Sequence, residues 1–192
     1  MVANFSGACR CKNSALGCPR KMSLAQKEEH ESGCDFRTFG CPFRMCSWTG
    51  FLPGLKPHLR QSHAARFLEG PVQRVVVEHN CPTLFYTDWA ISCHGEVFRL
   101  HVFQNIPNSM LYASCYYLGS TKRAADFTYT ITLEGSHQRR IAFTRQTHAE
   151  STKMSSLCET ADCFLIRGDT VKYFLHQGKL DLHVSLESTR SA

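Results

Sequence analysis

The sequence predicts a mainly β protein in which two small fingers rich in cysteine and histidine precede an antiparallel β-sandwich. Two groups of Cys and His residues recur with the same internal gap inside residues 11–63. Beyond residue 74, several stretches alternate apolar and polar residues, which is typical of half-buried strands. The charge also changes: residues 1–70 hold 10 Lys and Arg against 5 Asp and Glu, whereas residues 71–192 hold 12 against 11. We therefore expect two domains, residues 1–66 and residues 67–192.

The overall composition, 43% hydrophobic and 20% charged, is that of a folded globular protein. No apolar run reaches the roughly 20 residues needed to cross a bilayer. The opening residues MVANFSGACRC contain no basic stretch followed by an apolar core, so they do not resemble a secretory signal. We therefore expect a cytoplasmic protein, with the nucleus as a second compartment and no membrane partner. In such a reducing environment the 11 cysteines, an odd number, are expected as metal ligands or buried thiols rather than disulfides.

The first finger is predicted over residues 11–34 and the second over residues 41–63. The spacings are C-x6-C-x11-H-x3-C and C-x4-C-x11-H-x4-H, so the central gap of 11 residues recurs. Cysteine thiolates and histidine nitrogens in fours are the usual tetrahedral ligands of structural zinc. The expected ligands are Cys11, Cys18, His30 and Cys34 in the first finger, and Cys41, Cys46, His58 and His63 in the second. Each set is complete and leaves no open position for catalysis, so we expect two structural Zn²⁺ ions.

The three histidines among the first 70 residues all fall at ligand positions, which supports this assignment. One alternative remains open, because Cys9 in the sequence CRC could replace Cys11 as a ligand. The stretch LAQKEEHESGC predicts a helix ending near Gly33, which places His30 and Cys34 one turn apart. With zinc bound, the first site would carry a net charge of −1 and the second would be neutral.

The second finger resembles those that read DNA, but its side chains do not suit base recognition. Phe51, Gly54 and Pro57 occupy the positions that would face the bases, and none makes the bidentate hydrogen bonds that distinguish base pairs. The prolines and the glycine are also expected to shorten or disturb the helix. Phe51, Leu55 and Leu59 instead predict an apolar stripe that packs inside the finger or against its neighbour. Nucleic acid is therefore an unlikely partner, although the basic first segment keeps it as a third hypothesis.

The second domain is predicted to contain about seven strands. In the stretch 126–135, Phe127, Tyr129, Ile131 and Leu133 fall on one face and threonines on the other. Turns are expected at Gly135-Ser136, Gly168-Asp169 and Gln177-Gly178. The expected strands are residues 74–78, 97–103, 110–118, 126–135, 139–145, 162–168 and 179–186.

We find no motif for catalysis in this domain. The sequence contains no GxSxG, no HExxH and no phosphate-binding loop. Cys93 and His94 are adjacent, and on a strand they would point to opposite faces. The remaining cysteines, Cys81, Cys93, Cys115, Cys158 and Cys163, are expected as small core residues. No active site is therefore expected in this chain.

Taken together, these residues resemble the seven in absentia (SINA/SIAH) family of RING-type ubiquitin ligases. The resemblance covers nearly the whole chain. It is carried by CKNSALGC, EEHESGCDFR, CSWTG and HLRQSH in the fingers, and by DWAISCHG, YYLGSTKRAADFTYTITLEGSHQRR and DCFLI in the sandwich. The gap between Cys41 and Cys46 is two residues shorter than is usual in the family.

The resemblance implies a TRAF-like sandwich that binds substrates and forms dimers, within a pathway that ends in proteasomal degradation. Family substrates carry a Val-x-Pro degron, which adds to the sandwich as an extended strand. By position, the resemblance implies groove residues Asp88 and Trp89, together with Leu68, Val75 and Ile91. The expected partners are substrate or adaptor proteins with such a degron, and a second copy or a relative in a homodimer or heterodimer.

A RING domain, which recruits the ubiquitin-conjugating enzyme, needs C-x2-C pairs, and the chain contains none. We therefore expect the conjugating enzyme to be a partner only if a RING is present elsewhere. Three hypotheses remain at this point. The chain is the recognition and dimerisation module of a ubiquitin ligase, a RING-less regulator of full-length relatives, or a nucleic-acid-binding zinc protein.

Overall fold

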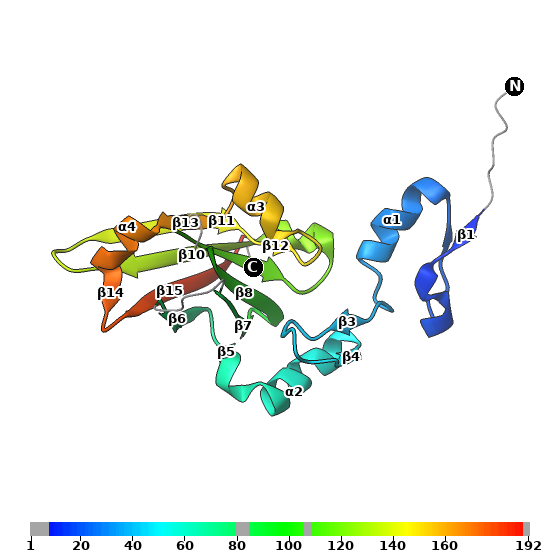
Figure 1. Cartoon of the computed structure of the whole chain (residues 1–192). Helices are drawn as coiled ribbons and strands as arrows, with labels where there is room; N and C mark the ends of the chain where they lie inside the picture. Colours follow the sequence, from blue (N-terminus) through cyan, green and yellow to red (C-terminus); the bar gives the residue numbers. More distant parts are fainter. Residues whose placement is uncertain (1–7, 80–84, 106–108, 190–192) are drawn as a thin grey trace, which may run out of the picture.

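The computed structural model describes residues 8–79, 85–105 and 109–189 as two small fingers followed by a two-sheet sandwich (Figure 1). No helix within these ranges is long and apolar enough to cross a membrane. The expected domain boundary stays a prediction. It falls where the short 3-10 turn η2 (Ala64–Arg66) ends and the strand β5 (Phe67–Glu69) begins.

The first finger consists of a short hairpin and one helix. The strands β1 (Cys9–Arg10) and β2 (Lys21–Met22) pair antiparallel, and the 3-10 turn η1 (Lys12–Leu16) connects them. The helix α1 (Leu24–Ser32) begins at Ser23, whose backbone N–H and hydroxyl both donate to Gln26 Oε1. It ends at Gly33, as the sequence predicted.

The second finger has the same plan, with β3 (Phe39–Gly40), β4 (Thr49–Gly50) and α2 (Leu52–Ser62). The prolines and Gly54 were expected to shorten or disturb this helix, and they do not shorten it, because α2 runs for 11 residues through Pro57. Pro53 lies in the first turn, where a backbone N–H has no partner within the helix. Pro57 removes one internal hydrogen bond, and the complete burial of Leu55 and Leu59 offsets that loss.

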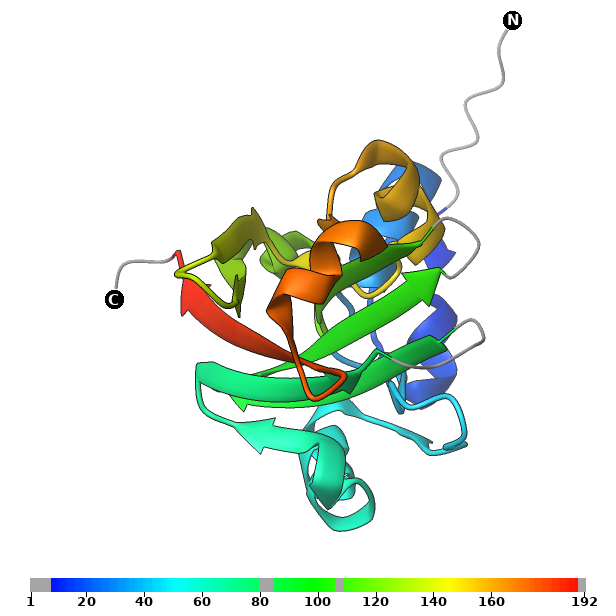
Figure 2. The ribbon, with the colours of Figure 1, turned by 60° about the vertical axis from the view of Figure 1, so that its left-hand side comes forward.

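The sandwich contains two sheets, each built around antiparallel strands. One sheet has the order β11-β10-β15-β14, with β6 paired to β15; the other has the order β12-β9-β8-β7-β5, with β13 paired to β9 (Figures 1 and 2). Two short pairs, β5 with β7 and β12 with β9, are parallel, which departs from the expected antiparallel pattern. The remaining strands are β6 (Val72–Glu78), β7 (Phe85–Cys93), β8 (Glu96–Asn105), β9 (Met110–Tyr117), β10 (Phe127–Glu134), β11 (Arg140–Gln146), β12 (His148–Ala149), β13 (Phe164–Arg167), β14 (Leu175–His176) and β15 (Lys179–Ser188).

Short helices connect some of these strands. They are η3 (Thr121–Asp126), α3 (Met154–Thr160), α4 (Gly168–Val171) and η4 (Lys172–Phe174). The expected turn at Gly168-Asp169 is therefore wrong, because these residues begin α4. The turns at Gly135-Ser136 and at Gln177-Gly178 are confirmed, the latter with positive φ at both residues.

All seven expected strands are present, and the alternation in β10 places Phe127, Tyr129, Ile131 and Leu133 in the core between the sheets. The residue pattern did not predict β7, although the family resemblance placed DWAISCHG, which overlaps this strand, in the sandwich. Most of its residues are buried on both faces, so it lacks the alternation that marks a strand with one wet face.

The cysteines outside the fingers follow the expectation in part. Cys93, Cys115 and Cys163 are buried. Cys158 is half-buried and packs against the small apolar cluster that contains Cys163. Cys81 lies outside the described residues.

The second finger is joined to the sandwich by an apolar cluster. Leu55 and Leu59, both 0% exposed, lie in this cluster, which we call the finger–sheet cluster. Phe51 does not share their burial and is 45% exposed, so the expected three-residue stripe is wrong at that position. Phe51 precedes the helix and is in extended backbone, which takes its side chain off the helical face. The buried members of the cluster are Phe43, Leu55, Leu59, Phe67, Ala90, Val97 and Leu118.

The first finger touches the sandwich through polar groups. Glu29 of α1 forms an ion pair with Lys122, and Arg37, in the segment that follows the finger, donates from Nη2 to the Gly119 carbonyl at 2.6 Å. Arg37 Nη2 also lies 3.2 Å from the Glu150 carboxylate. The two fingers therefore attach to one sandwich by different forces.

The finger–sheet cluster gives a prediction about stability. Leu55→Ala should lower the free energy of unfolding by about 2–5 kcal/mol, because it leaves a cavity where finger and sheet meet. The measurement is denaturant unfolding at fixed zinc concentration, with zinc content determined in parallel. Phe51→Ala, on the same helix terminus but exposed, is the matched control and should cost less than about 1 kcal/mol. Equal losses for the two variants would contradict the packing described here.

Candidate metal centres and peptide groove

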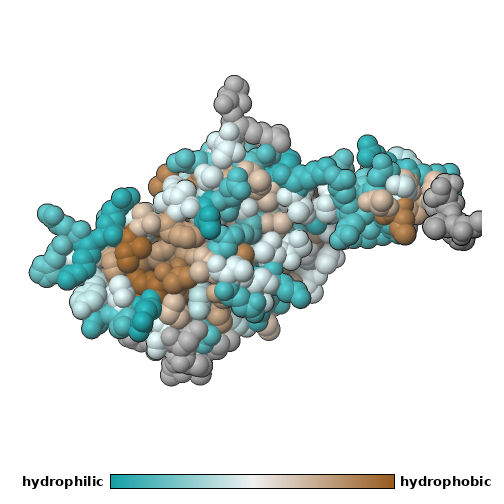
Figure 3. Space-filling model, turned by 90° about the horizontal axis from the view of Figure 1, so that it is seen from above, coloured by the Kyte–Doolittle hydropathy of each residue, from teal (hydrophilic) through white to brown (hydrophobic). Residues whose placement is uncertain are grey.

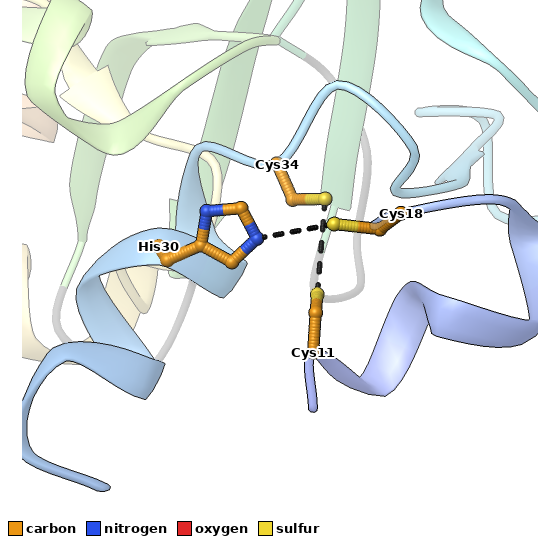
Figure 4. A group of neighbouring side chains, drawn as sticks. All are labelled: Cys11, Cys18, His30 and Cys34. Carbon is orange, nitrogen blue, oxygen red and sulfur yellow. Dashed lines mark hydrogen bonds between the residues drawn. The ribbon is translucent and has the colours of Figure 1, made fainter. Parts of the chain in front are cut away.

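The first finger brings its four expected ligands together. The ligand atoms of Cys11, Cys18, His30 and Cys34 all lie within 4.8 Å of one another (Figure 4). Cys11 Sγ is 3.8 Å from Cys34 Sγ, and Cys18 Sγ is 3.4 Å from His30 Nε2. The η1 turn separates the two cysteines of the loop, and the end of α1 supplies the other pair.

Of the two candidate cysteines Cys9 and Cys11, the structure brings Cys11 into this cluster. Cys9 lies on β1, and its thiol donates to the Met22 carbonyl at 3.1 Å across the hairpin. Strand pairing therefore holds Cys9 away from the other three ligands.

The second finger gathers Cys41, Cys46, His58 and His63 in the same way. Cys41 Sγ is 3.3 Å from His63 Nε2, and Cys46 Sγ is 3.4 Å from His58 Nε2. Two cysteines from the β3–β4 loop thus face two histidines from the last turns of α2 and its end.

Aromatic rings hold both histidines of the second finger. Trp48 stacks on His58 with ring centroids 4.6 Å apart and an interplanar angle of 5°. Phe43 packs on His63 at 4.4 Å. Gly50 makes room for this arrangement, since a Cβ there would lie 2.7 Å from the Trp48 ring.

Both donor sets suit a tetrahedral zinc ion. Bonds of about 2.3 Å to sulfur and about 2.0 Å to nitrogen place two sulfurs roughly 3.8 Å apart and a sulfur and a nitrogen roughly 3.5 Å apart. The separations in the two clusters, 3.3–3.8 Å, are of this size. The two clusters are therefore consistent with zinc binding.

Burial shifts the pKa of several residues in the two clusters. Burial raises the pKa of Cys41 to about 11 and raises the pKa of Cys11. These thiols would stay protonated at neutral pH unless a bound metal displaced the proton. Burial lowers the pKa of His63, which keeps its ring neutral and able to coordinate.

Cys34 differs from the other thiols. Burial acts to raise its pKa, but neighbouring N–H groups, with the Asn13 side-chain amide and the Phe36 backbone foremost, bring the pKa below its ordinary value. The first cluster therefore already favours negative charge on one of its three sulfurs.

Four of the five expected groove residues belong to one apolar region. Val75 and Ile91 are 3% and 0% exposed and lie in the core between the sheets. Leu68 and Trp89 are half-buried and pack against that core. Leu68 is the register partner of Ile91 across the parallel β5–β7 pair. Leu68 and Trp89 are therefore the accessible members of this group, and Val75 and Ile91 are its buried members.

Asp88 lies apart from these four, on the opposite face of β7. Its Oδ1 accepts from Arg99 Nε and His101 Nδ1, both at 2.7 Å, and the residue is 4% exposed. Burial acts to raise the pKa of Asp88, but the hydrogen bonds from His101 and Arg99 prevail and hold the pKa below its usual range. The geometry gives Asp88 a role in holding β7 to β8.

The backbone around the groove has unpaired edges that sequence reasoning did not find. Among the described residues, β6 pairs only with β15. β7 pairs with β8 along its length, but on its other side it meets β5 only at Ala90–Ser92. The outer edges of β6 and of Phe85–Trp89 are thus free of strand partners in the described ranges.

The sequence also matches two models of known protein families. Residues 6–74 match the Sina zinc finger, and residues 91–185 match the Sina TRAF-like domain. The chain belongs to the seven in absentia (Sina) family. It is a Sina zinc finger followed by a TRAF-like module, and Asp88 and Trp89 lie just before the second matched region.

Named relatives of this Sina-family chain are ubiquitin ligases. The chain is 28% identical to "E3 ubiquitin-protein ligase sina" of Schistosoma mansoni, over 92% of this chain and 49% of the relative. It is 31% identical to "Probable E3 ubiquitin-protein ligase sinah" of Drosophila melanogaster, over 91% and 51%. It is 27% identical to "E3 ubiquitin-protein ligase sina" of the same organism, over 92% and 58%. The chain thus spans about half the length of these curated relatives.

Proposed function

We propose that this chain recognises substrate or adaptor proteins for a Sina-type ubiquitin ligase, by capturing a Val-x-Pro segment as an added strand. The observation that carries the proposal is the pair of free edges on β6 and on Phe85–Trp89. An extended peptide that pairs with either edge gains main-chain hydrogen bonds. The half-buried Trp89 and Leu68 lie beside these edges and offer apolar contacts for its side chains.

The chain itself supplies recognition, and the transfer of ubiquitin needs a conjugating enzyme. We propose that this enzyme becomes a partner only through a RING present elsewhere in the assembly. The ten described cysteines are all free thiols. Free thiols suit the reducing cytoplasm or nucleus, where proteasomal degradation takes place.

We further propose that two zinc ions hold the fingers, one in each Cys/His cluster. Each finger has too small an apolar core to fold without such a crosslink. The ions would be structural, because four protein ligands complete each set.

We also propose that the chain forms a dimer through the side of the sandwich bordered by β11 and β13. Figure 3 shows an apolar patch, surrounded by hydrophilic residues, on the face that carries these strands and α4. Leu165 of β13 is 37% exposed, and Ile141 and Phe143 of β11 are only half-buried. A second copy with the same patch would cover these side chains by an isologous contact.

The zinc proposal predicts two equivalents of zinc for each chain. Cys11→Ser should lose one equivalent, because it removes a ligand from the first cluster. Cys9→Ser, two residues away, is the matched control and should keep both. Metal content after gel filtration is the measurement, and a wild-type chain without zinc would overturn the ligand assignment.

The strand-addition proposal is tested with Val-x-Pro peptides that carry a methyl group on one backbone nitrogen at a time. Alternate nitrogens of an added strand face the edge, so methylation should weaken binding about tenfold at every second position only. Isothermal titration calorimetry gives the affinities. A uniform effect at successive positions would contradict pairing with an edge.

In the same assay, Trp89→Ala should weaken the unmodified peptide while zinc content stays at two. Tyr86→Ala is the matched control, because Tyr86 is on β7 but points to the opposite face and is 38% exposed.

The dimer proposal predicts that Leu165→Glu yields monomers in sedimentation velocity, because the new charge would be buried against its own copy. Val72→Glu is the control, since Val72 is 71% exposed on β6, away from the patch. A wild-type chain that is monomeric at high micromolar concentration would disprove the proposed contact.

A further inference from the structure

One buried polar group in the first finger has no partner. Asn13 lies in η1, between the ligands Cys11 and Cys18, and is 7% exposed. Its side-chain nitrogen Nδ2 is buried and makes no hydrogen bond within the described residues. A buried amide donor without an acceptor destabilises the fold, because it has lost its hydrogen bonds to water. Such groups are rare in folded proteins and call for a physical explanation.

The backbone of Asn13 already forms hydrogen bonds with both cysteines of the Cys11–Cys18 loop. Its N–H donates to Cys11 Sγ at 3.4 Å, and its carbonyl accepts from the Cys18 N–H at 3.1 Å. Asn13 therefore holds both cysteines of the loop in place. This leaves the side-chain amide next to Cys34, which comes from the other half of the finger.

The two fingers differ in the charge that they must accommodate. With zinc bound, three thiolates and a neutral histidine leave the first site at −1, whereas two thiolates and two histidines leave the second neutral. N–H groups that donate to thiolate sulfur spread such an excess charge. The second finger has no amide side chain between Cys41 and Cys46, and its Arg44 turns outward to lie 3.9 Å over the ring of Tyr86.

We propose that Asn13 is a positioning residue of the first metal centre, whose side-chain amide donates to the Cys34 thiolate once the metal is bound. The donor compensates the extra negative charge of the three-thiolate set. It also ties the Cys11–Cys18 loop to the residue that follows α1. The inference rests on the proposed zinc sites, and it adds a role for a residue that is not itself a ligand.

The first test is zinc competition with a chromophoric chelator, using Asn13→Leu and Asn13→Asp. Asn13→Leu keeps the branched arrangement of side-chain heavy atoms and removes the donor, so the first site should bind zinc 10- to 100-fold more weakly, as is usual for outer-shell partners. Asn13→Asp should weaken it further, because a carboxylate would face a site that already carries excess negative charge. The second site of the same molecule is the internal control, and Ser14→Ala, exposed on the same turn, is the external one.

The second test uses wild-type protein loaded with ¹¹³Cd²⁺ and needs no variant. A hydrogen bond from Asn13 to a metal-bound sulfur should give a scalar coupling between ¹¹³Cd and a side-chain amide proton of Asn13. In Co²⁺-loaded Asn13→Leu, the sulfur-to-cobalt charge-transfer band should move to lower energy, since the thiolate loses a donor.

The outcomes separate the two proposals. A wild-type chain that binds no zinc refutes the metal sites themselves. A wild-type chain with two zinc ions, no ¹¹³Cd coupling at Asn13 and unchanged affinity in both variants refutes only the role of Asn13. If Asn13→Asp bound zinc as tightly as the wild type, the role of Asn13 would likewise be overturned. The site would then require the shape of the side chain and not its hydrogen-bond donor.

Discussion

The finger–sheet cluster is the contact on which the relation between the two domains depends. Metal ligation within a finger fixes the finger's own loop and helix, but it cannot orient them against a sheet. Leu55 and Leu59 supply that orientation, because they project from α2 onto Ala90 and Val97. Full burial of side chains of this size is worth roughly 1.5–3 kcal/mol each, enough to keep α2 continuous through its internal proline.

The strand β7 lies at the centre of this arrangement. Ala90 faces the second finger, while its neighbours Trp89 and Ile91 face the space between the sheets. On the finger side, Asp88 ties β7 to β8 through Arg99 and His101. One strand therefore carries the finger contact on one face and the proposed peptide contacts on the other. A change in how the finger packs on β7 would therefore alter the proposed peptide contacts directly.

Much of the fold could be predicted because it is specified by patterns among residues that are close together in the sequence. The recurring gap of 11 residues identified all eight clustered ligands, and the two-residue alternation identified strands such as β10. The failures concern features set by tertiary contact. β7 carries no alternation because finger and core bury both of its faces, and Asp88 could not be separated from Trp89 without knowing which face each side chain occupies. The free strand edges could not be predicted from the sequence either, because they depend on which strands become neighbours. Position in the family motif could suggest candidate residues, but only the structure separated the buried Val75 and Ile91 from the more accessible Leu68 and Trp89.

The contrast between the two finger attachments has a consequence for the shape of the molecule in solution. Apolar packing holds the second finger against the sheet, and moderate salt does not weaken this contact. The first finger is held by Glu29–Lys122 and by Arg37, whose partners are the Gly119 carbonyl and Glu150. Charge pairs near the surface weaken as the Debye length shrinks from about 10 Å at 0.1 M to about 3 Å at 1 M. Raising the ionic strength should therefore weaken the attachment of the first finger and of Arg37, while the second finger stays packed on the sheet. The distance distribution from small-angle scattering would then broaden with salt, although the sandwich itself remains unchanged.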